Sequence, residues 1–313
     1  MAANSSLTVG AVIPPEFIGL VDCPPVAALT TVMPDGSPQT SVVWCDFDGT
    51  YVRINTMRGF RKEKNMRANP KVTLLCYDPG EGLRYLEVRG TVVEMTEEGA
   101  MAHLDGLCMR YVGAAPYFGR CIDAKFRETE TPVLCRILPT RVLSGDWRKA
   151  VDMTDKMALP AVPPGLASPG PASPEPRVPD SHMDLLTRPI HGILTTMMPD
   201  GQAHSSLVWV DYDGECAVVN TTRERQKGPN IAANPKVSLL VVDPASTGRF
   251  IQIRGCAELV EDGAIDQLDR VTRKYTSHPC FYGRVYPVER QLLETRVICR
   301  IHATRITLDA VHA

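Results

Sequence analysis

The chain has 313 residues, about twice the length of a typical domain, so two domains are expected. Its 34 Lys and Arg residues against 36 Asp and Glu give a net charge of -2, which excludes general nucleic-acid binding because no positive field exists to hold a polyanion. No apolar run approaches the roughly 18 residues of a membrane span, and residues 1–10 lack the features of a signal peptide. We therefore expect a cytoplasmic protein without membrane contact.

From the N-terminus onward, the first half alternates apolar and polar residues between turn signals, which is typical of an antiparallel meander. Strands are predicted at residues 26–32, 40–45, 51–56, 72–77, 85–94 and 133–143, and helices at 61–68 and from 96 to about 111. The first helix should end at Asn69-Pro70, because a residue before proline avoids the helical conformation. Five or six antiparallel strands with one or two helices predict a small barrel, mainly β with minor α.

Proline is concentrated between the two halves of the chain. Eight of the 26 prolines lie within residues 160–179, among Ala, Ser and Gly. Such a stretch cannot form regular hydrogen-bonded structure and should be extended. The predicted division is a first repeat at 17–150, a Pro/Ala/Ser-rich linker at 151–182 and a second repeat at 183–313. A proline-rich recognition motif for a partner domain is the alternative.

The two halves are copies of one another. Residues 33–90 align without a gap with residues 198–255, and 27 of the 58 aligned residues are identical. After one deleted residue the offset falls from 165 to 164, which pairs residues 118–120 with residues 282–284. A repeat of this length is a duplicated domain and not a solenoid unit.

The cysteines and histidines give no sign of a metal centre. The ten cysteines form no C-x-x-C motif, and only Cys135 and Cys299 occupy equivalent positions. Because a structural framework should recur in both copies, reduced and mostly buried cysteines are expected. No histidine has a partner at ligand spacing, and the G-x-S-x-G, P-loop, H-E-x-x-H and G-x-G-x-x-G motifs are absent. We predict no metal site and assign no catalytic residue.

The segment after the third strand of each copy is rich in hydrogen-bond donors. It runs N-T-M-R-G-F-R-K-E-K-N at residues 55–65 and N-T-T-R-E-R-Q-K-G-P-N at residues 220–230. Hydroxyl, guanidinium and ammonium groups where a strand turns into a helix suit a phosphate. A solvated basic turn is the alternative, although Asn, Thr, Arg, Lys and Asn persist at matching positions while their neighbours vary.

Together with four further runs, this segment resembles the split β-barrel flavin/deazaflavin oxidoreductases of the pyridoxamine 5'-phosphate oxidase-like superfamily, and within them the probable F420-dependent branch. The four runs are L-T-T-x-M-P-D-G at residues 29–36, V-W-x-D-x-D-G at 43–49, A-N-P-K-V at 68–72 and R-Y-L-E-V-R-G at 84–90. The set recurs in the second copy. The resemblance implies two split β-barrel (FMN-binding-like) domains in tandem, forming an internal pseudo-dimer in a monomeric chain.

The resemblance also implies a function. An enzyme of this kind binds coenzyme F420 at the interface of the two repeats and transfers hydride to the activated double bond of an enone, quinone or tetrapyrrole. The alternatives are an FMN-dependent oxidoreductase of the same fold and a non-catalytic flavin or haem-product carrier. The expected partner is a small-molecule substrate, with no nucleic acid and no membrane.

The candidate cofactor-binding residues come from the basic segment and from two tryptophans. They are Asn55, Thr56, Arg58, Arg61, Lys62, Asn65, Asn220, Thr221, Arg223, Arg225, Lys227, Asn230, Trp44 and Trp209. Both tryptophans are predicted mid-strand, where packing is favoured over ring stacking. The first copy departs from the family pattern, because Phe60 stands where the second copy has Arg225. The two sites therefore need not be equally competent.

Three other pairs have simpler predicted roles. Arg89 and Arg254 are more typical of strand-end ion pairs than of cofactor contacts. The Phe-Gly-Arg and Tyr-Gly-Arg triplets at 118–120 and 282–284 favour a hydrophobic turn over a cover for a site. Tyr85 and Phe250 are expected in the core.

Overall fold

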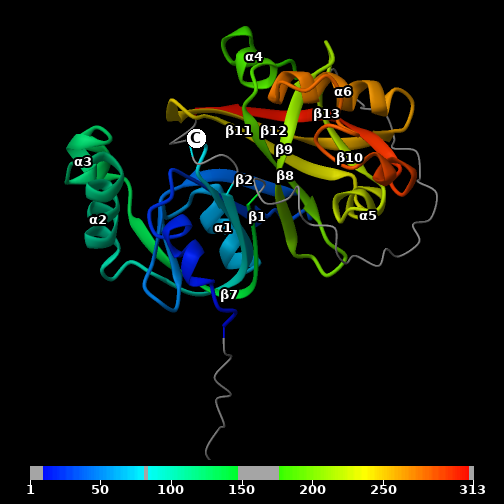
Figure 1. Ribbon diagram of the computed structural model, residues 1–313. Coiled ribbons are helices and arrows are strands. Elements are labelled where there is room, and N and C mark those ends of the chain that lie inside the picture. The colour runs from blue at the N-terminus through cyan, green and yellow to red at the C-terminus, as the bar shows by residue number, and fades with distance from the viewer. Residues whose placement is uncertain (1–9, 81–83, 147–175, 310–313) are drawn as a thin grey trace, which may run out of the picture.

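A computed structural model of the chain describes residues 10–80, 84–146 and 176–309, which form two β-rich halves lying side by side (Figure 1). The first half forms a seven-stranded curled sheet in the order β2-β1-β5-β6-β7-β4-β3. Its elements are η1 (Pro15–Leu20), β1 (Val26–Val32), β2 (Pro38–Val43), β3 (Cys45–Phe47), β4 (Val52–Met57), α1 (Arg61–Ala68), β5 (Lys71–Tyr77), β6 (Arg84–Thr96), α2 (Ala100–Val112), α3 (Tyr117–Arg120), η2 (Ala124–Glu128) and β7 (Pro132–Asp146).

The second half repeats this plan as a closed barrel in the order β10-β13-β12-β11-β8-β9. Its elements are α4 (Asp180–Thr187), β8 (His191–Met197), β9 (Ala203–Tyr212), β10 (Ala217–Thr222), α5 (Lys227–Ala233), β11 (Lys236–Asp243), β12 (Ser246–Val260), α6 (Ala264–Tyr275), η4 (Val288–Leu292) and β13 (Arg296–Leu308). The prediction of two split β-barrels, mainly β, is confirmed.

Strand β1 is buried along its whole length because it faces two cores. Ala27 and Leu29 point into the first barrel. Val26 and Ala28 belong to a second cluster that also contains Ile193 and Leu240 of the other half. Alternate side chains of a strand point to opposite faces, so one strand serves both the barrel core and the contact between barrels.

The contact between the barrels follows an approximate two-fold relation. Lys71 Nζ donates to the carbonyl of Asp200 at 2.6 Å, and its counterpart Lys236 Nζ donates to the carbonyl of Asp35, also at 2.6 Å. On the axis between them, the hydroxyl oxygens of Thr30 and Thr195 lie 3.3 Å apart. Reciprocal contacts of equivalent residues are the property of an isologous interface. The fused chain therefore forms an internal pseudo-dimer.

Helix α1 has the predicted bounds for local reasons. Gly59, with φ of +84°, turns the chain out of β4, and its backbone N–H donates to Glu63 Oε2 at 3.1 Å. At the other end Asn69 is extended and precedes Pro70. Helix α2, in contrast, begins at Ala100, four residues after the predicted start, because Gly99 adopts a left-handed conformation immediately before it.

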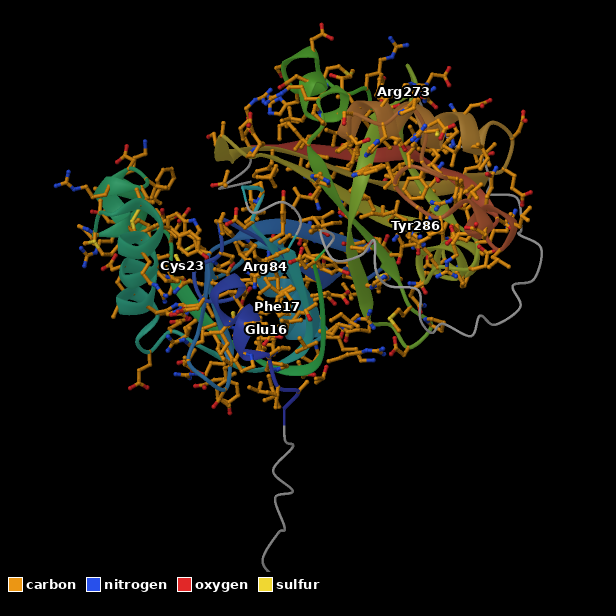
Figure 2. All side chains as sticks on the ribbon, viewed as in Figure 1. Glu16, Phe17, Cys23, Arg84, Arg273 and Tyr286 are labelled. Atoms are coloured by element: carbon orange, nitrogen blue, oxygen red, sulfur yellow. A yellow bond between two sulfur atoms is a disulfide. The ribbon has the colours of Figure 1, made fainter. Side chains whose placement is uncertain are left out.

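The N-terminal segment packs on the first barrel through η1. The Arg84 guanidinium lies 5.2 Å from the centre of the Phe17 ring and donates to the Glu16 carbonyl at 2.5 Å. Figure 2 shows these three labelled residues together beside β6. Phe17 in turn packs against the barrel core, so η1 covers one end of the barrel.

Two sequence expectations need correction. Cys108 and Cys121 form a disulfide that joins α2 to the turn after α3, so the expectation of reduced cysteines is wrong for this pair. Their counterparts in the second copy are Thr272 and Val285, which is why comparing the copies missed them. Trp209 lies within β9 as predicted, but Trp44 lies in the one-residue break between β2 and β3.

The domain boundaries remain predictions. Residues 151–175 of the predicted linker lie outside the described residues. Helix α4 begins at Asp180, just before the predicted end of the linker at 182. Among the described residues, no helix is long and apolar enough to cross a membrane.

Candidate functional site

A cavity of about 430 Å³ lies where the two repeats meet, within the range of about 300–1,000 Å³ that small-molecule sites occupy. Strands β2 and β4, the start of α1, helix α2 and the α3 segment supply its walls from the first repeat. The second repeat closes it with the β11–β12 hairpin, which extends toward the α2 and α3 side of the first barrel in Figure 1. The lining residues are Ser41, Val42, Val43, Trp44, Asn55, Thr56, Met57, Phe60, Lys62, Leu104, Leu107, Val112, Tyr117, Arg120, Cys121, Ile122, Thr247, Gly248 and Phe250.

One wall of the cavity is aromatic and firmly held. Trp44 stacks on Tyr111 with ring centres 5.3 Å apart, and Tyr117 meets Trp44 edge-on at 6.0 Å. The Tyr111 hydroxyl donates to the carbonyl of Cys45 at 3.0 Å, and the Tyr117 backbone N–H donates to Asp105 Oδ1 at 2.8 Å. Fixed aromatic faces of this kind suit a flat ring as ligand.

Two residues of the cavity lining, Asn55 and Thr56, each carry a buried polar atom. Asn55 Nδ2 donates to the carbonyl of Ala100 at 2.8 Å, which ties β4 to α2. Asn55 Oδ1 and Thr56 Oγ1 are buried and have no hydrogen-bond partner within the described part of the chain. An unpaired buried polar group costs about 1–3 kcal/mol, so a polar ligand that satisfied both would recover that free energy.

Lys62 supplies the positive charge of the cavity. Burial lowers its pKa to about 8, and the ammonium group forms no ion pair or hydrogen bond with any described residue. Because this pKa is near 8, the Lys62 side chain is still protonated in most protein molecules at neutral pH. An unpaired, enclosed ammonium group is suited to an anionic ligand such as a phosphate, with a charge-assisted bond of about 1.5–3 kcal/mol.

The other candidates of the first repeat lie outside the cavity lining. Arg58 is exposed and forms an ion pair with Glu97. Arg61 is exposed at the start of α1. Asn65 is buried, and its Nδ2 donates to Thr31 Oγ1 at 2.9 Å. Asn65 therefore holds α1 on β1, which explains its presence in the motif without any ligand.

The second repeat keeps the same framework with different surroundings. Asn220 Nδ2 donates to the carbonyl of Ala264 at 2.8 Å, and Asn230 Nδ2 donates to Thr196 Oγ1 at 2.9 Å. Thr221 Oγ1 is buried and, like Thr56 Oγ1, has no partner among the described residues. Trp209 stacks on Tyr275 at 5.3 Å, as Trp44 does on Tyr111.

The cations of the second repeat are mostly paired. Arg223 forms an ion pair with Glu261, and Arg225 lies 3.6 Å from Glu294. Burial lowers the pKa of Lys227 to about 8, with Arg225 and Arg296 acting in the same direction. Arg296, which was not predicted from the sequence, lies in the centre of this group with its side chain only 4% exposed.

Sequence reasoning missed several residues of the cavity. Thr247, Gly248 and Phe250 come from the other repeat, and no local signal marks a hairpin that completes a distant site. Phe250 was expected in the core, and it both packs there and lines the cavity. In the α3 segment Phe118 is buried as a hydrophobic turn requires, whereas Tyr117 and Arg120 line the cavity.

Arg89 and Arg254, which precede Gly90 and Gly255, have different partners. Arg89 forms an ion pair with Glu87 at 3.1 Å, as predicted. Arg254 instead lies with its Nη1 3.2 Å from the sulfur of Met33 and forms no ion pair with a described residue. Within the described ranges, no three His, Cys, Asp or Glu side chains are placed to hold a metal ion.

The fold is a split β-barrel, present twice. The profile of the pyridoxamine 5'-phosphate oxidase family matches residues 13–141 and again residues 178–308. The chain therefore belongs to the pyridoxamine 5'-phosphate oxidase family, with one family domain in each repeat.

Solved structures similar to the chain correspond to one repeat each. A protein described as an F420 reductase is 32% identical, with a TM-score of 0.36, over 42% of this chain and 98% of its own. A conserved hypothetical protein from Mycobacterium tuberculosis is 24% identical, with a TM-score of 0.36, over 49% and 96%. A putative pyridoxamine 5'-phosphate oxidase from Listeria innocua is 23% identical, with a TM-score of 0.32, over 41% and 95%. No curated protein matches the sequence.

Proposed function

We infer that the chain is an oxidoreductase that binds a deazaflavin, coenzyme F420, in the cavity between the repeats and reduces an activated double bond of the enone, quinone or tetrapyrrole type. Family membership supports a flavin-type cofactor. The observation that carries the proposal is the combination, in one cavity, of an aromatic wall, two unpaired buried acceptors and an unpaired ammonium group. These groups match a ligand that has a flat ring, hydroxyl groups and a phosphate.

Each part of the cavity would hold a different part of the cofactor. Lys62 and the Thr56 hydroxyl would hold the phosphate, and the Asn55 oxygen would accept from a hydroxyl of the ligand. Trp44, Tyr117 and Phe250 would enclose the ring and exclude water from it. When bound, the reduced ring supplies the hydride, and the protein contributes orientation and a dry pocket.

The chain also offers a proton to the product. Burial, with a smaller effect of Glu130, raises the pKa of Tyr117 to about 12, so its phenol stays protonated at neutral pH. Tyr117 lines the cavity and is therefore placed among the groups that a bound substrate could contact. Water is the other possible donor for this step.

The test combines binding with turnover. Purified protein is titrated with oxidised F420 and, separately, with FMN, while cofactor fluorescence is measured. Reduced F420 is then mixed with an enone, a quinone or a tetrapyrrole, and its reoxidation is followed by absorbance. We expect F420 to bind and to be reoxidised with at least one acceptor.

Other outcomes would replace the proposal with a defined alternative. A yellow protein that releases FMN on denaturation would show an FMN enzyme of the same fold. Tight F420 binding without reoxidation by any acceptor would show a non-catalytic flavin-binding protein. Failure to bind either cofactor would contradict the assignment of the cavity.

A further inference from the structure

The two repeats carry equivalent positions around two pseudo-equivalent sites, but four of these positions differ in charge. Phe60, which lines the first-repeat cavity, corresponds to Arg225 in the second repeat. Pro132 in the first repeat corresponds to Arg296 in the second, and Glu87 corresponds to Gln252. At the start of the helices, Arg61 corresponds to Gln226. Each difference changes the room or the charge available to an anionic ring cofactor.

We propose that the chain binds one cofactor, in the first-repeat cavity, and that the second-repeat site is closed by Arg296. This inference rests on the proposed function. It assigns Arg296 as the residue that determines which repeat binds.

Arg296 occupies the space that corresponds to part of the first-repeat cavity. Its guanidinium lies 3.5 Å from Asn220 Oδ1 and 4.8 Å from the centre of the Phe281 ring. Asn220 and Phe281 are the counterparts of Asn55 and Tyr117, which both line the cavity. A guanidinium between these two walls fills room that a ring would need.

The guanidinium is also fully engaged by its own repeat. Arg296 Nε donates to Tyr282 Oη at 2.7 Å, and Nη2 donates to Glu294 Oε2 at 2.8 Å. The two side chains of the ion pair are 4% and 10% exposed. Displacing Arg296 would leave Glu294 buried without this partner. The binding free energy of a cofactor would have to exceed the free-energy penalty of breaking this buried ion pair.

Glu87 reaches the second repeat from across the interface and is held there by its own partners. It is 1% exposed, accepts from the Ser205 backbone N–H at 2.8 Å and lies 3.0 Å from His204 Nδ1. It also forms an ion pair with Arg89 at 3.1 Å. Its charge is therefore balanced within this cluster, and closure of the second-repeat site depends on Arg296.

The first-repeat site is open where the second is filled. Pro132 stands at the position of Arg296 and brings no charged side chain to the cavity. Lys62 lines that cavity without an ion pair to any described residue, which favours an anionic ligand at this site.

The experiment counts bound cofactor per chain. Isothermal titration with F420, or with FMN if that is the cofactor bound, is carried out on the full chain and on Lys62→Gln and Lys227→Gln. We expect a stoichiometry of one for the unmodified chain, loss of that site in Lys62→Gln, and retention of it in Lys227→Gln. Thermal melts of both variants establish that they are folded.

The possible results separate this inference from the function on which it rests. Two sites per chain, or loss of the single site in Lys227→Gln with retention in Lys62→Gln, would overturn the inference while leaving the cofactor assignment intact. No binding of either cofactor to the unmodified chain would refute the proposed function itself. If Lys62→Gln fails to fold, Lys62→Met and the Lys227→Gln result still decide which repeat binds.

Discussion

The first and second repeats have nearly the same backbone plan but surround their sites with different charges. In the first, Lys62 forms no ion pair with a described residue and lines a cavity with an aromatic wall. In the second, Lys227 lies near two arginines and Glu87, and Arg296 is buried beside the counterpart of the cavity wall. The two copies thus keep the same fold, and they differ by single substitutions in the charged side chains around each site. We expect these differences to determine which copy binds a ligand.

The largest expected effect is on stability, at the ion pair found in only one repeat. Replacing Arg296 with Met removes the nearer of the two arginines beside Glu294, leaving Arg225 at 3.6 Å, and should lower the free energy of unfolding by about 2–3 kcal/mol. Arg300→Met is the matched control, because Arg300 pairs with Asp213 nearer the surface and its loss should cost about 1 kcal/mol or less. Urea unfolding measures both. Equal losses would show that Arg296 is not a buried structural ion pair.

The next effect is a pH dependence of cofactor affinity. Because the pKa of Lys62 is about 8, its ammonium group is lost as the pH rises above 8, and with it the contact to an anionic ligand. Affinity for FMN or F420 should be constant below about pH 7 to 8 and then fall by up to about tenfold per pH unit. Titrations between pH 7 and 9.5 test this. The fall should be absent in Lys62→Arg, whose guanidinium keeps its charge over this range, and an identical slope in that variant would exclude Lys62 as its source.

A smaller contrast is expected between the two tryptophans. Trp44→Leu removes a face of the cavity, whereas Trp209→Leu changes the equivalent position of the other repeat. Trp44→Leu should weaken cofactor binding by about 0.5–1.5 kcal/mol, and Trp209→Leu should mainly affect thermal stability. Fluorescence titration and thermal melts compare them. Equal losses of affinity would contradict the difference between the repeats.

The smallest effect concerns a feature that the repeats share. Arg58 pairs with Glu97 and Arg223 with Glu261, both with substantial exposure. Arg58→Gln and Arg223→Gln should each lower the free energy of unfolding by about 0.2–1 kcal/mol, in similar amounts. Urea unfolding in low and high salt tests this, because screening should reduce both losses. A loss of several kcal/mol in only one variant would show that the repeats differ here too.

Much of the fold followed from the sequence because the determinants are local. Strand β1 and helix α1 have the bounds predicted, since period-two alternation, Gly59 and Asn69-Pro70 act within a few residues. The duplication, taken together with the family resemblance, predicted the pseudo-dimer. Among the candidate residues, Asn55, Thr56, Lys62 and Trp44 line the cavity.

The rest depended on contacts that the sequence does not mark. Thr247 and Phe250 reach the cavity from the other repeat, so their role depends on how the barrels pair. Asn65 recurs in both copies for packing, which repetition alone cannot separate from ligand binding. Arg296 and the disulfide of Cys108 with Cys121 occur in only one copy, so comparing the copies concealed them.

The contact of Glu87 with His204 has a consequence for which halves associate. If two first repeats paired with each other, each Glu87 would meet the neutral Gln39, the counterpart of His204, and the imidazole contact would be lost twice. A pair of second repeats would bring Gln252 to His204 and remove the carboxylate instead. Unlike halves are therefore preferred over like halves, so this contact selects the pairing of a first repeat with a second repeat over the pairing of two identical repeats.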